Sequence, residues 1–391
     1  MRPVVARIDL DALRSNLAVA RELAGGRRVV AVVKADAYGH GALSVARALL
    51  AAGCEELAVV SVEEAAALRD AGIAAPLLVL GGVLDREDAR EVLARHLVPA
   101  LQERAHLERL REALREAPRP RPVPVQVEID TGMRRMGAAG PEAARLLAEV
   151  VGDPAFALAG VFTHLARADE ADPAPSLAQA EQLARVLAPL RERGEQPGNV
   201  HIANSAGLLH LPALLRALPG QTAVRPGLLL YGVCPRPDVP ELARRLRPVM
   251  TLAARVVRVV RLQPGEAVGY GGTYRAERPT RLATIPVGYG DGLLRSLSNR
   301  GAVWIRGALH PVAGRVSMDS TTVDVGAHPV EVGDEVVLFG ALPERPGPGG
   351  SGSRLAVEEV AERAGTIPYE LLVRIGPRVV RVFEPAAPSR G

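Results

Sequence analysis

Eight short apolar runs alternate with amphipathic segments between residues 29 and 232. The runs are VVAVVKAD (29–36), LAVVSV (57–62), LLVLGG (77–82), LVPAL (97–101), VPVQVEID (123–130), LAGVFTHL (158–165), NVHIANS (199–205) and TAVRPGLLLYG (222–232). Short runs that are apolar throughout are typical of parallel strands covered on both faces. Helical spacing of apolar residues predicts helices between them, at 41–53, 63–71, 86–95, 103–116, 142–150, 177–193 and 206–217. This alternation favours a closed parallel (β/α)8 barrel of the TIM type, with an open doubly wound sheet as the alternative.

The chain on either side of these runs has a different character. VVARIDL (4–10) predicts a strand, and Asp11 is predicted to cap the helix that follows it. After Pro237 the β-branched runs are short and are broken by Gly and Pro, which is typical of an all-β domain. We therefore expect an α/β barrel domain over residues 11–238 and an all-β C-terminal domain over 239–385, joined by the N-terminal strand at 1–10. A length of 391 residues suits two domains.

Composition argues against several other classes of protein. A hydrophobic content of 48% supplies a buried core and does not suit bulk disorder. The net charge is only +4 and aromatic residues make up 3%, so we expect no surface for nucleic acid. Cys54 and Cys234 are too few for a disulfide framework or a metal cluster. With no apolar signal core near the start and no run of membrane-spanning length, we expect a cytoplasmic protein that does not bind membranes.

Lys34, in VVAVVKADAYGHG (29–41), is the only lysine among 48 basic residues, and the others are all arginine. Arginine supplies positive charge anywhere on a surface, but its guanidinium is effectively never deprotonated. Arginine cannot provide a primary amine that condenses with a carbonyl. The lone lysine is therefore interpreted as a Schiff-base residue, and pyridoxal 5′-phosphate (PLP) is the commonest aldehyde cofactor held in this way. The alternative is that Lys34 has no chemical role and is a lysine retained by chance at a buried strand end.

Polar residues gather at the C-terminal ends of the predicted barrel strands, which is where barrels bind their ligands. They are Lys34 and Tyr38 after the first strand, Arg135 after the fifth, His164 at the end of the sixth, Asn204 and Ser205 at the end of the seventh, and Arg225 and Gly227 after the eighth. The Ser205 hydroxyl and the backbone amides of the Arg-Pro-Gly-Leu turn suit a phosphate group. His164 taken alone could equally be a satisfied core histidine.

VVKADAYGHG resembles the PLP-lysine signature of the alanine racemase family. The likeness continues in order along nearly the whole chain, in EIDTGMRRMG (128–137), GVFTHLARADE (160–170), HIANSAG (201–207), VRPGLLLYG (224–232), VGYGGTYRA (268–276), GYGDGLLR (288–295), GRVSMDSTTVDV (314–325) and GTIPYELLVRIGPRVVRVF (365–383). The resemblance implies a PLP-binding N-terminal barrel, a C-terminal β domain and a head-to-tail homodimer in which both chains line each active site. It implies a racemase that interconverts L- and D-alanine and supplies D-alanine for peptidoglycan.

The resemblance also implies how the cofactor is held. Lys34 would carry PLP and act as one of two acid–base groups, and Tyr270 of the partner subunit would be the other. Arg225 would face the pyridine nitrogen, and His164 would link Arg225 toward Tyr270. The other implied cofactor contacts are Tyr38, Asn204, Ser205, Tyr369 and the backbone amides of Gly227 and Leu228.

The substrate contacts are implied in the same way. The alanine carboxylate would meet Arg135 and the Met318 backbone, and alignment to DTGM selects Arg135 over its neighbour Arg134, which spacing alone does not. The positions that face the substrate or its access path are Tyr289, Asp319, Asp169, Arg295 and Arg315. Of these, Asp169, Arg295 and Arg315 could equally be plain surface charges.

These implied roles agree with the chemistry of racemisation. A proton must leave one face of Cα and return on the other, so two opposed bases suit the reaction better than one. Nearby guanidinium groups lower the pKa of a lysine amine or a tyrosine hydroxyl. Many PLP enzymes place a carboxylate against the ring nitrogen, which deepens the electron sink. Arg225 in that position would leave the nitrogen unprotonated and would favour racemisation over transamination.

Glu128 departs from the family pattern. Many members carry a lysine at this position, which is modified to a carbamate and hydrogen-bonds the carboxylate-binding arginine. Glu128 is an anion without any modification. Our hypothesis is that Glu128 orients Arg135 in place of the carbamate, through its shorter side chain or a bridging water.

Two other functions stay open at this point. A broad-specificity or serine racemase on the same fold would differ in the width of the pocket near Tyr369 and Tyr289. A non-catalytic PLP-carrier protein belongs to a different class and resembles the barrel half alone. The C-terminal motifs that contain Tyr270, Met318 and Asp319 count against the carrier.

Overall fold

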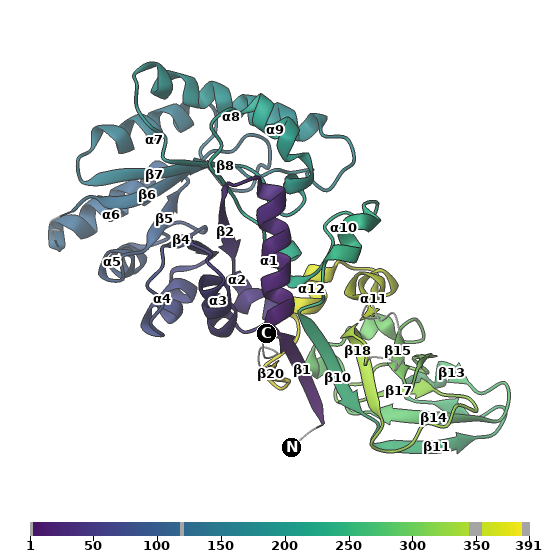
Figure 1. Cartoon of the computed structure of the whole chain (residues 1–391). Coiled ribbons are helices and arrows are strands. Elements are labelled where there is room, and N and C mark those ends of the chain that lie inside the picture. The colour runs from purple at the N-terminus through teal and green to yellow at the C-terminus, as the bar shows by residue number, and fades with distance from the viewer. Residues whose placement is uncertain (1–2, 118–120, 344–353, 385–391) are drawn as a thin grey trace, which may run out of the picture.

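The structure is a computed structural model that describes residues 3–117, 121–343 and 354–384. Eight parallel strands form a closed barrel, coloured purple to teal in Figure 1. Its strands are β2 (Arg28–Val32), β3 (Glu56–Val59), β4 (Leu77–Val79), β5 (Val98–Leu101), β6 (Val123–Glu128), β7 (Phe156–Phe162), β8 (Asn199–His201) and β9 (Ala223–Val224). β9 closes the ring by pairing with β2, with Ala223 beside Arg28 and Val224 beside Val29. The predicted barrel is confirmed, and the open-sheet alternative is excluded.

Helices cover the outside of the barrel where the apolar spacing predicts them. They are α1 (Leu10–Ala24), α3 (Ala42–Ala51), α4 (Val62–Asp70), α5 (Arg86–Ala94), α6 (Arg104–Glu116), α7 (Gly140–Gly152), α8 (Ala174–Glu192), the 3-10 turn η1 (Gly207–His210) and α9 (Leu211–Ala217). Their ends lie within a few residues of the predicted ones. Each helix places its apolar stripe against the strands, which is why a helical period predicts them well.

The prediction that Asp11 caps the first helix is wrong. β1 (Val4–Asp9) ends at Asp9, whose carboxylate accepts a hydrogen bond from the Ala12 N–H at 2.7 Å and so caps α1. Asp11 already lies in the first turn of α1, where a negative charge is favourable, and pairs with Arg14. Two aspartates that are two residues apart both match a capping pattern, and the strand end decides between them.

The barrel strands are shorter than the apolar runs that predict them. β2 ends at Val32 and β9 at Val224, whereas the runs continue to residues 36 and 232. The remaining residues form two short helical segments at the C-terminal end of the barrel, α2 (Lys34–Gly39) and the 3-10 turn η2 (Leu228–Tyr231). Residues 228–231 are buried there although they are outside the sheet, so the apolar run does not mark the strand end. Lys34 therefore begins a helical turn and is not part of a strand.

Outside the barrel, the described residues form three further sheets that are mostly antiparallel. The largest has the order β16 (Ala308–Pro311), β15 (Ala302–Ile305), β18 (Glu335–Ala341), β10 (Met250–Arg255), β1 and β20 (Val380–Glu384), with β19 (Arg354–Leu355) beside β18. The others are β11 (Arg258–Leu262), β14 (Thr280–Ile285) and β17 (Thr321–Asp324), and the pair β12 (Ala267–Val268) and β13 (Tyr274–Arg275). The predicted α/β plus all-β fold class is confirmed.

The N-terminal strand belongs to this C-terminal sheet. β1 pairs antiparallel with β10 and parallel with β20, and Figure 1 shows it leading from that sheet into α1. The boundary predicted between residues 238 and 239 falls just before α10 (Pro240–Arg245) and stays a prediction, and residue 385 lies outside the described residues.

The two halves share one apolar core. It runs from Leu13 and Val30 in the barrel half to Leu252 in β10 and Leu372 in α12 (Pro368–Val373), and α11 (Val357–Ala364) packs on it as well. α12 lies against α2, so the C-terminal part of the chain reaches the barrel mouth. Within the described residues, every helix is too short or too polar to cross a membrane, and the cytoplasmic location stays a prediction.

Candidate active site

A cavity of about 690 Å³ lies at the C-terminal end of the barrel strands. Its volume is in the range of small-molecule sites, roughly 300–1,000 Å³. Eleven of the residues predicted for the site line it together, namely Lys34, Tyr38, Glu128, Arg135, His164, Asn204, Ser205, Arg225, Gly227, Leu228 and Tyr369. Residues that lie far apart in the sequence thus meet at one place because parallel strands end at the same side of a barrel.

Lys34 enters the cavity from a left-handed turn of the backbone. Residues 35–38 have φ between 53° and 55° and ψ between 40° and 53°. This conformation costs roughly 1–2 kcal/mol per residue when the side chain is not glycine. Such strain persists only where the surroundings enforce it. Lys34 and Tyr38 lie at the two ends of the strained segment, and both line the cavity.

Two carboxylates hold this turn in place, one from outside it and one that belongs to it. Glu64 Oε1 accepts a hydrogen bond from the Ala35 N–H at 2.7 Å. Asp36 Oδ1 accepts one from the Ala42 N–H, also at 2.7 Å, and so ties the turn to the first residue of α3. Both bonds have a charged acceptor and are stronger than neutral ones. They help to offset the cost of the left-handed backbone.

His40 also holds this turn, through hydrogen bonds to its backbone. It is fully buried, and its Nδ1–H donates to the carbonyls of Ala37 and Tyr38, each at 2.9 Å. Its ring lies 4.6 Å from the ring of Tyr231. Burial lowers the pKa of His40 to about 4, so the imidazole is neutral at pH 7.

The surroundings of Lys34 favour its uncharged amine. Burial lowers the pKa of Lys34 first, and the charges of Arg135 and Arg225 lower it further, while Glu64 opposes them. An amine must lose its proton before it condenses with a carbonyl. The site therefore prepares the only lysine of the chain for the chemistry predicted for it.

Three tyrosines form an aromatic group beside Lys34. The ring of Tyr38 lies 4.7 Å from that of Tyr231 and 5.9 Å from that of Tyr369, which α12 brings to the barrel mouth. The Tyr231 hydroxyl donates to the Val32 carbonyl at 2.9 Å. Burial raises the pKa of Tyr38 and of Tyr369. Both hydroxyls therefore stay protonated at neutral pH and can donate to an anion.

Ser205 and the segment that begins at Gly227 form the adjacent wall. The N–H groups of Gly227 and Leu229 donate to Ser205 Oγ at 2.9 and 3.2 Å. Gly227 approaches the Tyr38 hydroxyl so closely that a Cβ at position 227 would lie 2.4 Å from that oxygen. Because Ser205 Oγ accepts from these amides, its own proton remains to be donated, and together with the phenol of Tyr38 it suits a phosphate.

Arg225 is a buried residue that also lines the cavity. Its Nη1 donates to His201 Nδ1 at 2.5 Å and to the His201 carbonyl at 3.0 Å, and its Nη2 donates to the Thr163 carbonyl at 2.7 Å. The guanidinium lies 4.6 Å from the centre of the Phe162 ring. Burial lowers the pKa of Arg225 to about 10, although Glu128 opposes this. Arg225 therefore remains a cation at pH 7 and can only donate hydrogen bonds.

Glu128 faces Arg135 and Arg225 across the cavity wall, but its hydrogen bond comes from Gln102. Gln102 Nε2 donates to Glu128 Oε2 at 2.7 Å and to the Leu80 carbonyl at 2.8 Å. Burial raises the pKa of Glu128, while the Gln102 hydrogen bond and the charges of Arg225 and Arg135 lower it. Arg135 thus acts on Glu128 through its charge, and the proposed orienting role of Glu128 stays a hypothesis.

The two adjacent arginines have different surroundings. Arg135 lines the cavity, whereas Arg134 is exposed and its guanidinium lies 3.5 Å from the Asp130 carboxylate. The backbone of Arg134 is left-handed, with φ of 58°, and this turn gives the two side chains different surroundings. The geometry therefore supports Arg135 as the residue that meets a substrate carboxylate.

A second hollow of about 790 Å³ adjoins the cavity. It shares His164, Asn204, Leu228 and Tyr369 with the cavity, and Asp169 lines it. Burial lowers the pKa of His164 to about 3, and the charges of Arg225, Arg135 and Lys34 act in the same direction. His164 is therefore a neutral imidazole with one donor and one acceptor nitrogen.

The other predicted residues belong to the C-terminal domain and line neither hollow. They are Tyr270, Tyr289, Arg295, Arg315, Met318 and Asp319. Tyr270 begins the 3-10 turn η3 (Tyr270–Gly272) just before β13, and Figure 1 shows β13 at the end of the C-terminal domain away from the barrel. Its side chain is 71% exposed.

Several of these C-terminal residues lie close to one another. The Tyr289 N–H donates to the Ser317 carbonyl at 3.0 Å, and the Gly290 N–H donates to the Met318 carbonyl at 2.9 Å. The side chains of Tyr289 and Met318 are exposed. Asp319 pairs with Arg378 at 2.6 Å. Tyr289 starts the 3-10 turn η4 (Tyr289–Asp291), and Arg295 starts η5 (Arg295–Leu297).

His201 and Gln102 support the site but were not predicted from the sequence. His201 contacts Arg225, and Gln102 holds Glu128. A signal for His201 was available, because a histidine at the end of an apolar barrel strand is unusual and HIANSAG already contains it. No such signal marks Gln102, since its neighbour Glu128 is 26 residues away in the sequence.

The cavity fits PLP by the chemistry of its donors. Tyr38, Tyr369 and Ser205 supply hydroxyls for a phosphate, and Lys34 supplies the amine for an aldehyde. Arg225, a donor without an acceptor atom, matches the lone pair of an unprotonated pyridine nitrogen. The close approach of Gly227 to Tyr38 leaves no room for a side chain at position 227.

Known protein families and individual proteins match nearly the whole length of this chain. The family "Alanine racemase, N-terminal domain" matches residues 8–235, and "Alanine racemase, C-terminal domain" matches residues 249–383. The alanine racemase of Sorangium cellulosum is 42% identical over 389 residues, which cover 98% of this chain and 99% of that protein. The alanine racemase of Carboxydothermus hydrogenoformans is 39% identical over 391 residues, which cover 98% of this chain and all of that protein.

Solved structures give the same result. The alanine racemase from D-cycloserine-producing Streptomyces lavendulae superposes with a TM-score of 0.88 at 36% identity, covering 99% of this chain and 98% of that one. The alanine racemase from Bacillus anthracis with bound L-Ala-P superposes with a TM-score of 0.86 at 32% identity, covering 99% and 96% of the two chains.

Proposed function

The chain belongs to the alanine racemase family, and from that premise we propose that it interconverts L- and D-alanine with PLP bound through Lys34. The observation that carries this proposal is the one cavity in which the only lysine of the chain meets Tyr38, Ser205, Arg225 and Tyr369. D-alanine made in this way would serve peptidoglycan synthesis.

The cofactor would be held at both ends and at its ring. PLP, when bound, supplies an electron sink that makes the Cα proton of an amino acid acidic. Its phosphate would be bound by the hydroxyls of Tyr38, Tyr369 and Ser205 and by the amides of Gly227 and Leu228, with Asn204 beside them. Arg225 would donate to the ring nitrogen and, as a permanent cation, would keep that nitrogen unprotonated.

Two groups on opposite faces would move the proton at Cα. The Lys34 Nζ, whose pKa is lowered by burial and by Arg135, would exchange it on one face. The hydroxyl oxygen of the partner subunit's Tyr270 would exchange it on the other, with neutral His164 linking Tyr270 to Arg225. Exposure of Tyr270 away from the cavity of its own chain supports a homodimer, because a phenol used in catalysis must be enclosed by some protein surface.

The substrate carboxylate would be bound at the cavity wall and by the partner. Arg135 would pair with it, and Glu128 would hold Arg135 by charge. The Met318 backbone, Asp319 and Tyr289 of the partner subunit would complete the binding site. Asp169, Arg295 and Arg315 would line its access path.

A broad-specificity or serine racemase is the main alternative, and a wider pocket near Tyr369 and Tyr289 would favour it. A non-catalytic PLP carrier is disfavoured because the match to the family extends over residues 249–383. Incubation of the purified protein, supplied with PLP, with a panel of L-amino acids tests all three. We expect loss of optical rotation with L-alanine and much slower loss with L-serine. Equal rates with both would support a broad-specificity racemase, and no loss with any substrate would contradict the proposal.

A further inference from the structure

Three polar side chains cross the inside of the barrel beneath Arg225. Glu56 on β3, Gln126 on β6 and His201 on β8 are 3%, 1% and 0% exposed. Their strands are not neighbours in the barrel order, so these side chains can meet only by pointing inward. Barrel interiors are usually filled with branched apolar side chains. A connected row of polar side chains inside this barrel is therefore unusual, and its members need hydrogen-bond partners.

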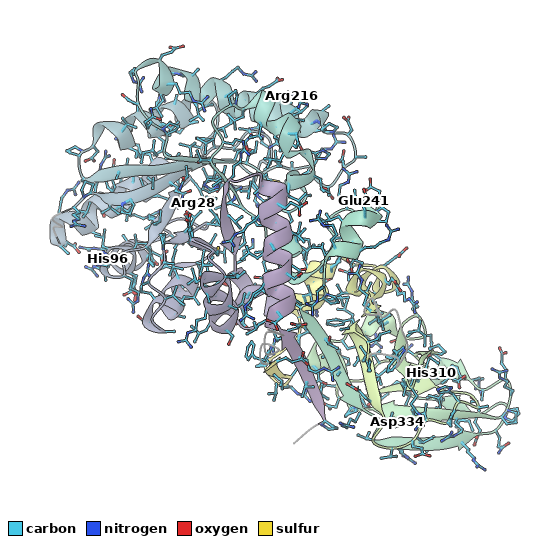
Figure 2. All side chains as sticks on the ribbon, in the orientation of Figure 1. Arg28, His96, Arg216, Glu241, His310 and Asp334 are labelled. Carbon is cyan, nitrogen blue, oxygen red and sulfur yellow. The ribbon has the colours of Figure 1, made fainter. Side chains whose placement is uncertain are left out.

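Hydrogen bonds join the three residues into a line that ends on Arg225. Arg225 Nη1 donates to His201 Nδ1 at 2.5 Å, His201 Nε2 donates to Gln126 Oε1 at 2.7 Å, and Gln126 Nε2 donates to Glu56 Oε1 at 3.1 Å. Glu56 Oε2 lies 3.9 Å from Arg28 Nη1. Figure 2 labels Arg28 at the end of β2 away from α2, so the line runs from the cavity to the opposite end of the barrel.

Each bond in this line has a required direction. Arg225 has no acceptor atom, so His201 Nδ1 must carry a lone pair and His201 Nε2 must carry the proton. A carboxylate only accepts, and Glu56 faces a donor with each of its oxygens. Gln126 must therefore turn its NH2 toward Glu56 and its carbonyl oxygen toward His201. The guanidinium of Arg225 at one end and the carboxylate of Glu56 at the other therefore require the same tautomer of His201.

We propose that Glu56 is a positioning residue for Arg225: through Gln126 it holds His201 as the Nε2–H tautomer, so that His201 Nδ1 accepts from the guanidinium. If the Gln126 amide turned over, its NH2 would meet His201 Nε2 and the imidazole proton would move to Nδ1. Two donors would then face each other at Arg225, which would be left with an unsatisfied buried group. This inference rests on the proposed function, in which Arg225 faces the ring nitrogen of PLP.

Glu56→Gln tests the donor–acceptor direction of these hydrogen bonds without changing the length of the side chain at position 56. Arg28 attracts the oxygen of the new amide, which leaves the amide NH2 facing Gln126 and turns the Gln126 amide over. Adding Gln126→Glu to this variant provides an acceptor-only side chain beside His201 and restores the original tautomer. Glu55→Gln is the matched control, because Glu55 is the adjacent residue and pairs with the same Arg28 at 3.1 Å but lies outside the line.

The tautomer of His201 can be read by ¹⁵N NMR of the holoenzyme labelled in its histidines, with His201→Asn used to assign the signal. We expect Nδ1 to be unprotonated in the wild type, in Glu55→Gln and in the double variant, and protonated in Glu56→Gln. Racemisation in both directions should fall about tenfold in Glu56→Gln, a usual effect of losing a supporting hydrogen bond. It should recover in the double variant.

A protonated Nδ1 in the wild-type enzyme would overturn the inference, even if Glu56→Gln does not fold. Equal losses in Glu55→Gln and Glu56→Gln would also overturn it, as would a double variant that folds without recovering activity. The proposed function fails by a different result, namely a wild-type protein that does not bind PLP or does not racemise alanine.

Discussion

The hydroxyl of Tyr38 lies against the backbone of Gly227, where a Cβ would approach it to 2.4 Å. Gly227→Ala must therefore displace Tyr38 from the phosphate side of the cavity, and overpacking of this kind costs about 1–3 kcal/mol. We expect weaker PLP binding, measured by titration of the apoenzyme. Gly152→Ala is the control, because a Cβ there meets no atom within 4 Å. Unchanged affinity in Gly227→Ala would show that Tyr38 does not contact the cofactor.

Lys34→Ala should remove the visible absorption band of the bound cofactor and abolish racemisation, because no other side chain in the sequence carries a primary amine. Lys34→Arg is the matched control, since it keeps the positive charge but cannot form a Schiff base. Absorption spectra of the purified variants with added PLP are the measurement. A retained band in either variant would show that PLP is not bound through Lys34.

Tyr270→Phe should slow proton exchange from L-alanine more than from D-alanine if the two bases act on different faces. Mixed dimers test whether the bases come from different chains. Lys34→Ala and Tyr270→Phe are each expected to be inactive as homodimers. After mixing and re-association, a shared site predicts recovery of about a quarter of wild-type activity, because half of the dimers are mixed and each of these has one intact site.

No recovery in a mixture that forms mixed dimers would show that both bases come from one chain. Equal slowing from the two enantiomers in Tyr270→Phe would contradict the division between the two faces. The two results are independent, so the dimer and the two-base proposals can fail separately.

Glu128→Gln should raise the KM for alanine about tenfold, which corresponds to the loss of about 1.4 kcal/mol of charge interaction with Arg135. The variant removes the negative charge that faces Arg135 and keeps the shape of the side chain and its contact with Gln102. Steady-state kinetics in both directions are the measurement, and Glu87→Gln on the exposed surface of α5 is the control. Unchanged affinity and turnover would contradict the orienting role of Glu128.

His40 should make the protein less stable in mild acid. Burial lowers the pKa of His40 in the folded state to about 4, below the usual value of 6.5, so the unfolded chain binds one more proton between these pH values. Stability is full above pH 6.5 and falls as the pH drops toward 4, by about 3 kcal/mol for this residue. Other buried histidines act in the same direction, so the slope must be compared with that of a variant.

His40→Asn should flatten the dependence of the free energy of unfolding on pH, measured with urea between pH 7 and 4.5. His96→Asn is the control, because His96 is exposed (labelled in Figure 2) and its left-handed φ of 53° suits asparagine. The same slope in His40→Asn and in the wild type would show that His40 does not control acid stability.

The barrel and the grouping of its functional residues could be predicted from sequence for a physical reason. Parallel strands buried on both faces leave continuous apolar runs, and the polar residues that follow such runs must meet at one end of the barrel. Lys34, Arg135, His164 and Arg225 were found in this way. The ends of the strands were not, because the apolar character of residues 228–231 continues into a buried turn.

The left-handed turn after Lys34 could not be predicted from the local sequence. Ala-Asp-Ala-Tyr contains no glycine, and the residues that enforce its conformation include Glu64, which is 29 positions from its partner Ala35. The choice of Asp9 over Asp11 as the helix cap depended on where β1 leaves its sheet. In each case a contact distant in sequence overrides a local pattern that fits more than one structure.

The first strand of the protein lies between β10 and the last one, β20, with Asp9 beside Glu384. During synthesis, residues 4–9 leave the ribosome long before the segment that must lie next to them exists. All eight barrel strands are synthesised while β1 still lacks both of its neighbours in the sheet. Deleting the final strand would therefore leave β1, the strand made first, with one edge uncovered, and such an edge is a site for aggregation of incomplete chains.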